Sequence, residues 1–480
     1  MSKKSFLSRI LVLSILVLFV VVPFVVAEVG VTQTYIVLYK KQQVPADAGS
    51  FITAAGGTLA YSYGTIGVAI ARSDNASFRS NLLKDSRIEG ASATNSFGVK
   101  LETEIETIDE GALLSTSSTW GDPLSILQWD MYQIHVPEAH EITMGSPSVI
   151  VGDIGTGLDY THPDLAANVD FANSVSCVGG VPNQDPAAWM DDNGHGTHTA
   201  GTIAAAANGI GIVGVAPNVK IAGIKAGNAD GFFFPEAVVC AFMWAGSHRL
   251  NVTNNSYFAD PWLFNCRNDK EQHAIWKAEQ RAIRWAMSQG VTVVAAIGNE
   301  NMDLAHPAVD NISPDYPPGS AVTRDINNAC VVIPVEISGV IGVSANGSQL
   351  NKAYFSNYGV SVTQVVAPGG DRRFQDPGDG SGGYVLSTFP GNRYALVQGT
   401  SMASPHVAGV AALLISQYGN MPQGAVQSAI ISTADPVACP PNPFNPGGTG
   451  EWLATCQGDE DYNGFYVNGQ VNALSAVTYK

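Results

Sequence analysis

The stretch Gly399-Thr-Ser-Met-Ala-Ser-Pro-His-Val-Ala-Gly409 decides the fold of this chain. A Gly-Thr turn leads into an apolar run that continues to Ile415 and predicts a buried helix. Pro405 is expected in the first turn of that helix, where its missing N–H has no cost. Ser401 would then lie where free backbone N–H groups and the positive helix end favour an anionic oxygen. This position suits a nucleophilic serine, whereas the ordinary alternative is a serine that only caps the helix.

A second glycine-rich stretch, Asn193-Gly-His-Gly-Thr-His-Thr-Ala-Gly201, offers a base for this serine. A serine hydroxyl is a poor nucleophile until a base removes its proton. The glycines beside His195 allow substrate to approach closely, and the alanine-rich run that follows predicts a helix. A lone histidine is more often an ordinary buried or surface residue, but the nine-residue pattern favours catalysis.

Both stretches resemble the serine and histidine motifs of subtilisin-like serine proteases, the subtilase family. The resemblance implies that Ser401 is the nucleophile, that His195 is the general base and that His198 is structural. Ala403 occupies the last glycine position of a Gly-x-Ser-x-Gly pattern, which argues against the nucleophile elbow of α/β-hydrolases.

Two further segments match functional positions of the family. Val293-Val-Ala-Ala-Ile-Gly-Asn-Glu300 ends a predicted strand and resembles the oxyanion motif. The Asn299 carboxamide and the Ser401 N–H would share the developing charge, whereas the alternative is an ordinary turn asparagine. Val252-Thr-Asn-Asn-Ser-Tyr257 lies where the family has a substrate-binding edge, and Ser256 matches a residue whose backbone pairs with an extended peptide.

The third member of the expected catalytic triad is missing. Subtilases place an aspartate at the end of the first strand in the pattern apolar-Asp-Thr-Gly, whereas this chain reads Val149-Ile-Val-Gly-Asp-Ile-Gly-Thr-Gly-Leu-Asp-Tyr-Thr-His-Pro-Asp-Leu165. The downstream residues fix the register and put Gly155 at the aspartate position. Asp153 is an alternative on the same face of the strand, but it lies ~6–7 Å away at ~3.3 Å per residue. It would reach His195 only if the strand end shifted by two residues.

Loss of that carboxylate predicts a slow enzyme and not an inert one. In subtilisin, removal of the triad aspartate alone costs about 10⁴ in turnover. We therefore expect a secreted serine endopeptidase of reduced activity that forms an acyl-enzyme at Ser401. The alternative is an impaired pseudoprotease that binds peptides or its own propeptide.

Short apolar runs alternate with helical stretches after Leu127, and this alternation predicts an α/β fold. A mostly parallel sheet flanked by helices, which is the subtilisin-like fold, fits the pattern. The strands are expected near 149–151, 219–224, 291–296 and 340–343, and the helices near 237–247, 272–289 and 400–417.

The N-terminal part divides into three predicted regions. Residues 1–27 have a basic start and a long apolar run, which indicate a cleaved signal peptide; a retained membrane anchor is the alternative. Residues 28–101 predict a small α+β domain that resembles the ferredoxin-like inhibitory propeptide of subtilases, with strands near 35–39, 57–61 and 66–70 and helices near 46–55 and 76–83. Residues 102–123 show no periodicity and predict a linker with the processing site, and 124–480 are the peptidase domain.

The charge balance of the chain limits its expected partners. The chain carries 41 acidic against 24 basic residues and a net charge of −17, which argues against nucleic-acid binding. Polypeptide substrates and the chain's own propeptide are the expected partners of a secreted monomer. No stable membrane association is expected after signal removal.

Six cysteines follow the predicted signal, and an even number in an exported chain predicts disulfides. Cys439 and Cys456 flank a Pro/Gly-rich loop and form the expected local pair, while the other pairings stay open. No catalytic cofactor is expected. The resemblance implies a structural calcium ion in the loop 206–212, held by the Asn208 side chain and loop carbonyls, with Asp164 reaching across. A plain loop is the alternative.

Overall fold

The computed structural model describes residues 31–94, 105–108, 120–259, 262–314 and 319–479, so the predicted signal peptide lies outside the described residues. The centre of the fold is a seven-stranded sheet of order β16-β15-β11-β9-β6-β8-β7, in which all neighbouring strands are parallel. The predicted α/β class is confirmed. The strands are β6 (Ile150–Gly155), β7 (Val175–Ser176), β8 (Lys220–Lys225), β9 (Val252–Asn255), β11 (Thr292–Ala296), β15 (Ile341–Asn346) and β16 (Val365–Pro368).

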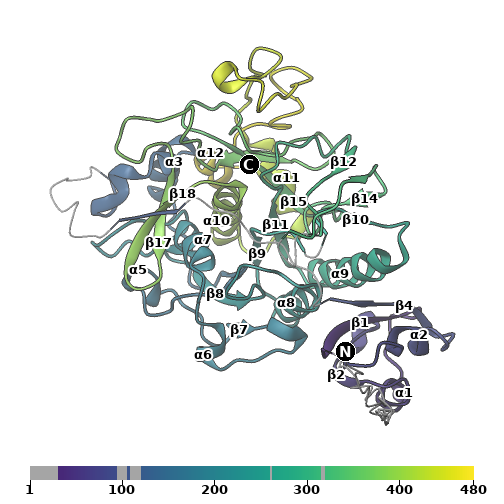
Figure 1. Cartoon of the computed structure of the whole chain (residues 1–480). Helices are drawn as coiled ribbons and strands as arrows, with labels where there is room; N and C mark the ends of the chain where they lie inside the picture. The colour runs from purple at the N-terminus through teal and green to yellow at the C-terminus, as the bar shows by residue number, and fades with distance from the viewer. Residues whose placement is uncertain (1–30, 95–104, 109–119, 260–261, 315–318, 480) are drawn as a thin grey trace, which may run out of the picture.

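Long helices cover both faces of this sheet (Figure 1). Helices α7 (His195–Ala204) and α10 (Thr400–Tyr418) share one apolar core with Val151 of β6. Helices α8 (Pro235–Ser247) and α9 (Lys270–Ser288) share another core with Ile154. Because side chains alternate along a strand, Asp153 and Gly155 face α7 and α10 together with Val151.

The order of the strands predicts where a site forms. The chain enters the sheet in its middle at β6, places β8 and β7 on one side and then β9, β11, β15 and β16 on the other. The order therefore reverses between β6 and β9, and open α/β sheets bind ligands outside the carboxyl ends of the strands at such a point. The stretches that follow β6, β9 and β11 all leave the sheet at this edge.

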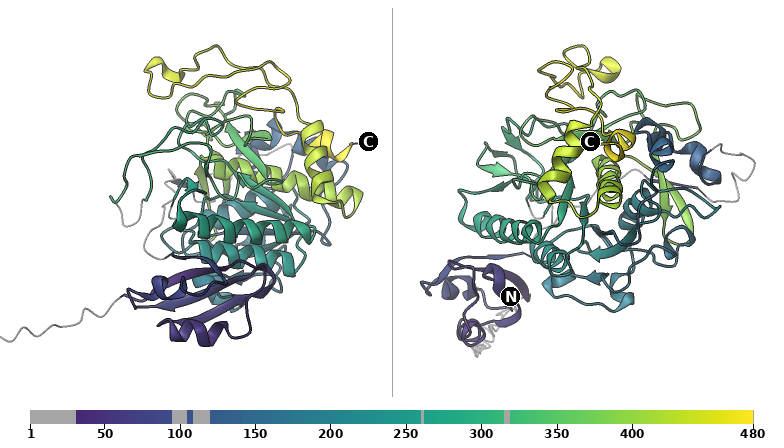
Figure 2. Two further views of the ribbon diagram at one scale, coloured as in Figure 1. Left: turned by 90° about the vertical axis from the view of Figure 1, so that its right-hand side faces the viewer. Right: turned by 180° about the vertical axis from the view of Figure 1, so that it is seen from behind.

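A small α+β unit precedes the large sheet and packs against α8 and α9 (Figure 2). Gly90 allows the close approach, because a Cβ there would lie 2.9 Å from the Cβ of Ala274 on α9. The predicted elements are present, and β4 is an additional strand that the sequence pattern did not indicate. The antiparallel sheet has the order β2-β3-β1-β4, and its elements are β1 (Gln33–Tyr39), α1 (Ala48–Ala54), β2 (Thr58–Tyr63), β3 (Val68–Ser73), α2 (Phe78–Leu82) and β4 (Ile88–Ala93).

The segment predicted to be a linker without regular structure contains a strand, so that expectation is corrected at four residues. Strand β5 (Ile105–Ile108) pairs antiparallel with β18 (Arg393–Val397), which also pairs with β17 (Val385–Phe389). So short a strand has too few residues to show a period, and its structure depends on its partner.

Three disulfides join the six cysteines in the pairs Cys177–Cys240, Cys266–Cys330 and Cys439–Cys456. The expected local pair, Cys439 with Cys456, is confirmed. Among the helices of the described segments, none is long and apolar enough to span a lipid bilayer.

Candidate active site

Ser401 lies in the first turn of α10, and the structure corrects the predicted place of Pro405. The helix begins at Thr400, so Pro405 falls in its second turn. A proline at this position leaves the Ser401 carbonyl without its usual helical donor four residues later. The hydroxyl of Ser256 donates to that carbonyl instead, at 2.8 Å. This bond fastens the start of α10 to the segment that follows β9.

The hydroxyl of Ser401, the predicted nucleophile, also contacts this segment. Ser401 Oγ donates to the backbone carbonyl of Ser256 at 3.2 Å, and both residues are 2% exposed. The residue predicted to bind substrate through its backbone therefore lies directly beside the predicted nucleophile.

Asn299 follows β11 and is oriented by Thr400, the residue before the predicted nucleophile. Its Oδ1 accepts hydrogen bonds from the Thr400 N–H at 2.8 Å and from the Thr400 hydroxyl at 2.9 Å. With the oxygen fixed in this way, the Nδ2 amide is left to donate elsewhere. An oriented amide beside the nucleophile is the geometry that an oxyanion hole requires.

His195 begins α7 beside the end of β6. A Cβ at Gly196 would overlap the carbonyl oxygen of Gly157, so glycine is needed for the start of α7 to approach this segment. The Gly196 N–H donates to Thr156 Oγ1 at 2.9 Å. Because β6 and β9 are neighbours, this contact places His195 at the same edge of the sheet as Ser256.

The imidazole of His195 is buried, and neither ring nitrogen has a hydrogen-bond partner among the described residues. The Ser401–His195 hydrogen bond is thus not formed; in free enzymes such bonds are often long and tighten only when substrate binds. Burial lowers the pKa of His195 to about 4, and the charge of Asp191 opposes this shift. The ring is therefore neutral near pH 7, as a general base must be.

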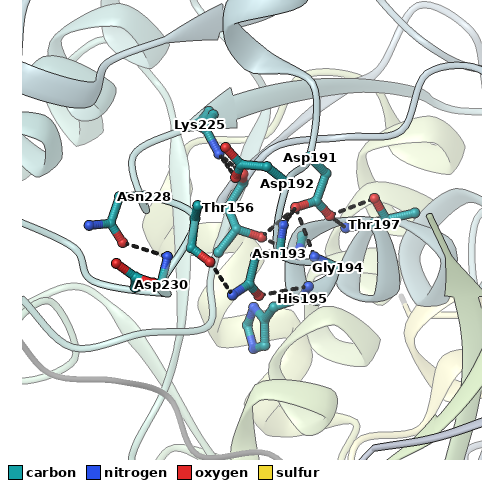
Figure 3. Close-up of polar contacts among 12 residues, drawn as sticks. Thr156, Asp191, Asp192, Asn193, Gly194, His195, Thr197, Lys225, Asn228 and Asp230 are labelled. Atoms are coloured by element: carbon teal, nitrogen blue, oxygen red, sulfur yellow. Dashed lines mark hydrogen bonds and ion pairs between the residues drawn. The ribbon is translucent and has the colours of Figure 1, made fainter.

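Asp191 is a site residue that we did not predict from the sequence (Figure 3). One carboxylate oxygen accepts from the Thr156 hydroxyl and the N–H groups of Asn193 and Gly194, and the other accepts from the N–H and hydroxyl of Thr197, all within 2.6–3.1 Å. Its carboxylate holds the turn before His195, and no dashed line ends on the imidazole in Figure 3. The sequence feature that could have indicated Asp191 is its place four residues before a histidine that begins a predicted helix, where an aspartate can accept hydrogen bonds from free N–H groups.

Gly155 ends β6 close to this turn and offers no acid to His195. A Cβ at position 155 would lie 3.3 Å from the Cα of Gly196 and 3.6 Å from Oδ2 of Asp153. Asp153 does not replace the missing carboxylate by a direct bond. Its Oδ2 accepts from the Thr199 hydroxyl at 2.7 Å and its Oδ1 from the Asn254 amide at 2.8 Å, so the alternative register, with Asp153 bonded to His195, is not observed.

Comparison with known proteins agrees with this geometry. Residues 146–469 match the sequence model of the Subtilase family, Peptidase S8. The chain belongs to the subtilase family. The Thermophilic serine proteinase of Bacillus sp. (strain AK1) is 33% identical over 357 residues, which cover 73% of this chain and 67% of that protein. Subtilisin DY of Bacillus licheniformis is 34% identical over 287 residues, 60% of this chain and 84% of that protein.

A solved structure confirms the fold of this subtilase. The epidermin leader peptide processing serine protease of Staphylococcus aureus, solved as a serine-to-alanine mutant, is 22% identical to it, with a TM-score of 0.69. The alignment covers 93% of this subtilase and 99% of that chain. Its subtilisin relatives identify the present chain as a serine endopeptidase.

The residues predicted to hold calcium lie close together in this subtilase. Asp164 Oδ2 accepts from the Ile212 N–H at 3.0 Å and the Tyr394 hydroxyl at 2.9 Å, while Oδ1 is buried with no partner in the described segments. Burial raises the pKa of Asp164 to about 7, and these hydrogen bonds offset the shift only in part. Asp122, which the sequence did not single out, accepts from the N–H groups of Asn208 and Gly209 at 2.9 Å.

This loop only partly matches a metal site. Asn208 Oδ1 accepts from the Ile210 N–H within the same loop. Within the described residues, no group of three or more His, Cys, Asp or Glu side chains gathers as a metal-binding cluster. Any cation would therefore depend on carbonyl oxygens beside Asp164, which suits calcium.

Proposed function

We propose that this subtilase is a secreted endopeptidase that acylates Ser401 and works slowly because position 155 carries no carboxylate. One observation carries the proposal: at the edge between β6 and β9, Ser401 bonds to Ser256, Thr400 orients Asn299, and the start of α7 holds His195 against the end of β6. The site thus combines a nucleophile, a neutral base and an oriented amide.

The reaction follows from these groups. An extended peptide lies along the backbone after β9, and Ser401 Oγ turns from the Ser256 carbonyl toward the imidazole of His195. The hydroxyl proton passes to His195 as Oγ attacks the peptide carbonyl carbon. The Asn299 amide and the Ser401 N–H stabilise the oxyanion, and His195 then protonates the leaving amine. Water attacks the acyl-enzyme by the same route in reverse.

The rate is low for a definite physical reason. A base whose pKa lies near 4 takes a proton weakly, and the imidazolium that forms has no carboxylate bonded to its other nitrogen. The tautomer and orientation of the ring are also left to packing alone. Chemistry remains, since the nucleophile and the oxyanion donors are in place.

Labelling with a fluorophosphonate tests this function directly, because the probe reacts only with an activated serine. We expect slow, saturable labelling of the intact chain at Ser401, none in Ser401→Ala, and at least tenfold slower labelling in His195→Ala. A surface variant, Ser146→Ala, serves as the serine control. If the unaltered chain remains unlabelled while binding peptides, it is a pseudoprotease and the proposal is wrong.

We also propose that the α+β unit of β1–β4 is an inhibitory propeptide and that residues 1–27 direct export. Its packing against α8 and α9, together with the pairing of β5 with β18, the strand that precedes α10, supports the first proposal. Incubating the unaltered chain and the Ser401→Ala variant without other proteases tests whether the chain cleaves itself. Only the intact chain is expected to shorten, and equal shortening of both would contradict self-processing.

Calcium is proposed at the loop 206–212, where it would neutralise Asp164. Because burial raises the pKa of Asp164 to about 7, the folded state favours its neutral form, and stability falls as pH rises from about 4 to 7. A bound cation favours the charged form and reverses this loss. We therefore expect calcium to raise Tm more at pH 8 than at pH 5, and to raise it far less in Asp164→Asn. An equal calcium shift in both chains would place the ion elsewhere.

A further inference from the structure

Asp153 lies at the centre of a polar network beneath the active site. It is 2% exposed, on the face of β6 that points toward α7 and α10. Thr199 of α7 donates to one carboxylate oxygen and Asn254 of β9 to the other, at 2.7 and 2.8 Å. A carboxyl group on the buried face of a strand is unusual unless it serves a role, because its desolvation is costly.

The network reaches the two helices that carry the proposed base and nucleophile. Thr199 lies one helical turn after His195, and its hydroxyl also contacts the His195 carbonyl at 3.3 Å. Asn254 Oδ1 accepts from Ser404, three residues after the nucleophile on α10, at 2.7 Å. Asn254 Nδ2 also donates to Ser256 Oγ at 3.2 Å, and Ser256 in turn donates to the Ser401 carbonyl.

The carboxylate also stands next to the place where the triad acid is missing. Oδ2 of Asp153 lies 3.6 Å from the position that a Cβ of residue 155 would occupy. Asp153 is the acceptor in both of its hydrogen bonds, and accepting hydrogen bonds favours the charged form of the carboxyl group. The carboxyl group of Asp153 thus lies two residues before position 155 on the same face of the strand.

We propose that Asp153 is a positioning residue that stands in for the missing triad acid, acting on His195 through Thr199 and through its charge, and on Ser401 through Asn254. The inference rests on the proposed function, since it assigns a role in the same reaction. Asp153 makes no bond to the imidazole. It sets the start of α7 and α10 relative to β9, and its negative charge favours the imidazolium that forms in the transition state.

Charges around Asp153 shape its titration. Burial raises the pKa of Asp153 to about 7, the bonds from Thr199 and Asn254 oppose this, and the charge of Asp191 adds to it. Tyr257 also interacts with the charge of Asp153. The pKa of Tyr257 is raised chiefly by burial, and the charge of Asp153 adds to this shift. Asp153 is therefore ionised above pH 7, where His195 is already a free base.

The decisive variant is Asp153→Asn in the full chain, assayed by fluorophosphonate labelling and by peptide hydrolysis from pH 5 to 9. We expect kcat to fall about 10- to 100-fold, the value of one charge-assisted hydrogen bond, with KM within about twofold. Because Asp153 becomes ionised near pH 7, the rate of the unaltered chain should rise as pH increases through 7, and Asp153→Asn should lose this rise. Glu336→Gln changes another carboxyl whose pKa is also raised to about 7, and it should alter neither quantity.

A second variant keeps the inference testable if Asp153→Asn fails to fold. Thr199→Val removes the bond to α7 but keeps the carboxyl group, so labelling should slow about tenfold, and the rise should persist but move to higher pH because that bond lowers the pKa of Asp153. Unchanged rates in both variants, or a slower Asp153→Asn that keeps the rise near pH 7, would overturn the inference alone. If the unaltered chain is never labelled, the proposed function fails and the inference fails with it.

Discussion

At the scale of single residues, Pro405 accounts for the position of Ser401, the proposed nucleophile, although it makes no hydrogen bond to that residue. Its missing N–H frees the Ser401 carbonyl from the helix, and the hydroxyl of Ser256 takes the place of that donor. The sequence alone showed that a proline follows the serine by four positions. The structure shows that α10 begins at Thr400, so Ser401 and Pro405 both lie within the helix. The carbonyl that loses its helical donor is therefore that of Ser401.

Gly155→Asp tests whether turnover is limited by the lack of a carboxylate at position 155. The new side chain would start 3.3 Å from the Cα of Gly196, in the turn that carries His195. It would also start 3.6 Å from Oδ2 of Asp153, and two adjacent carboxylates share a proton. Asp153 then keeps its proton to a higher pH, so the new carboxylate is the charged one.

We expect kcat of Gly155→Asp on a chromogenic peptide to rise at least tenfold, with an upper limit of about 10⁴ set by the cost of losing this acid in subtilisin. Gly155→Asn is the matched control, since it has the same size without the charge, and it should give no such gain. Turnover of Gly155→Asp that equals that of the unaltered chain would mean that the triad is completed elsewhere.

At the scale of elements, the turn before α7 depends on one carboxylate. Asp191 accepts five hydrogen bonds from the turn, from Thr197 and from Thr156 after β6. The glycines and the histidine of this motif are visible in the sequence, and they predict a helix start. The hydrogen bond between Asp191 and Thr156 cannot be read from the sequence, because these residues are 35 positions apart.

Asp191→Ala should therefore destabilise the fold by about 3 kcal/mol, since buried donors lose a charged partner. Urea unfolding followed by circular dichroism measures the change, and peptide hydrolysis should fall as the turn loosens. Asp185→Ala is the control, because Asp185 is exposed and caps only α6 (Pro186–Trp189) through the Ala187 N–H. It should cost about 1 kcal/mol. Equal effects of the two variants would contradict a special role for Asp191.

At the scale of the whole molecule, the N-terminal unit is held by a buried cation of α9 as well as by apolar packing. Arg281, whose side chain is 7% exposed, donates to the carbonyls of Tyr39 and Ile66 at 2.8 and 3.2 Å and pairs with Glu89 at 2.8 Å. Removing one member of such a pair leaves its partner without a counter-charge.

We expect Arg281→Met to weaken this docking by about 3 kcal/mol. In a Ser401→Ala background, which prevents self-cleavage, amide hydrogen exchange in β1 and β4 should become faster. Lys277→Met is the matched control on the same helix, because among the described residues the Lys277 ammonium donates a hydrogen bond only within α9, to Gln280. Exchange that responds equally to both variants would show that the packing of α9, and not the pair, holds the unit.

The motifs at Ser401, His195 and Asn299 were enough to determine the family and the fold class and to predict the order of the proposed reacting groups, because each is a local pattern of residues. The proposed loss of the triad acid at Gly155 likewise rests on the register within one segment. The bonds of Asp153 to Thr199 and Asn254, like the pairing of β5 with β18, could be decided only by the tertiary structure. The physical reason is that a hydrogen bond depends on distance in space, and these partners are 46, 101 and nearly 300 residues apart in the chain.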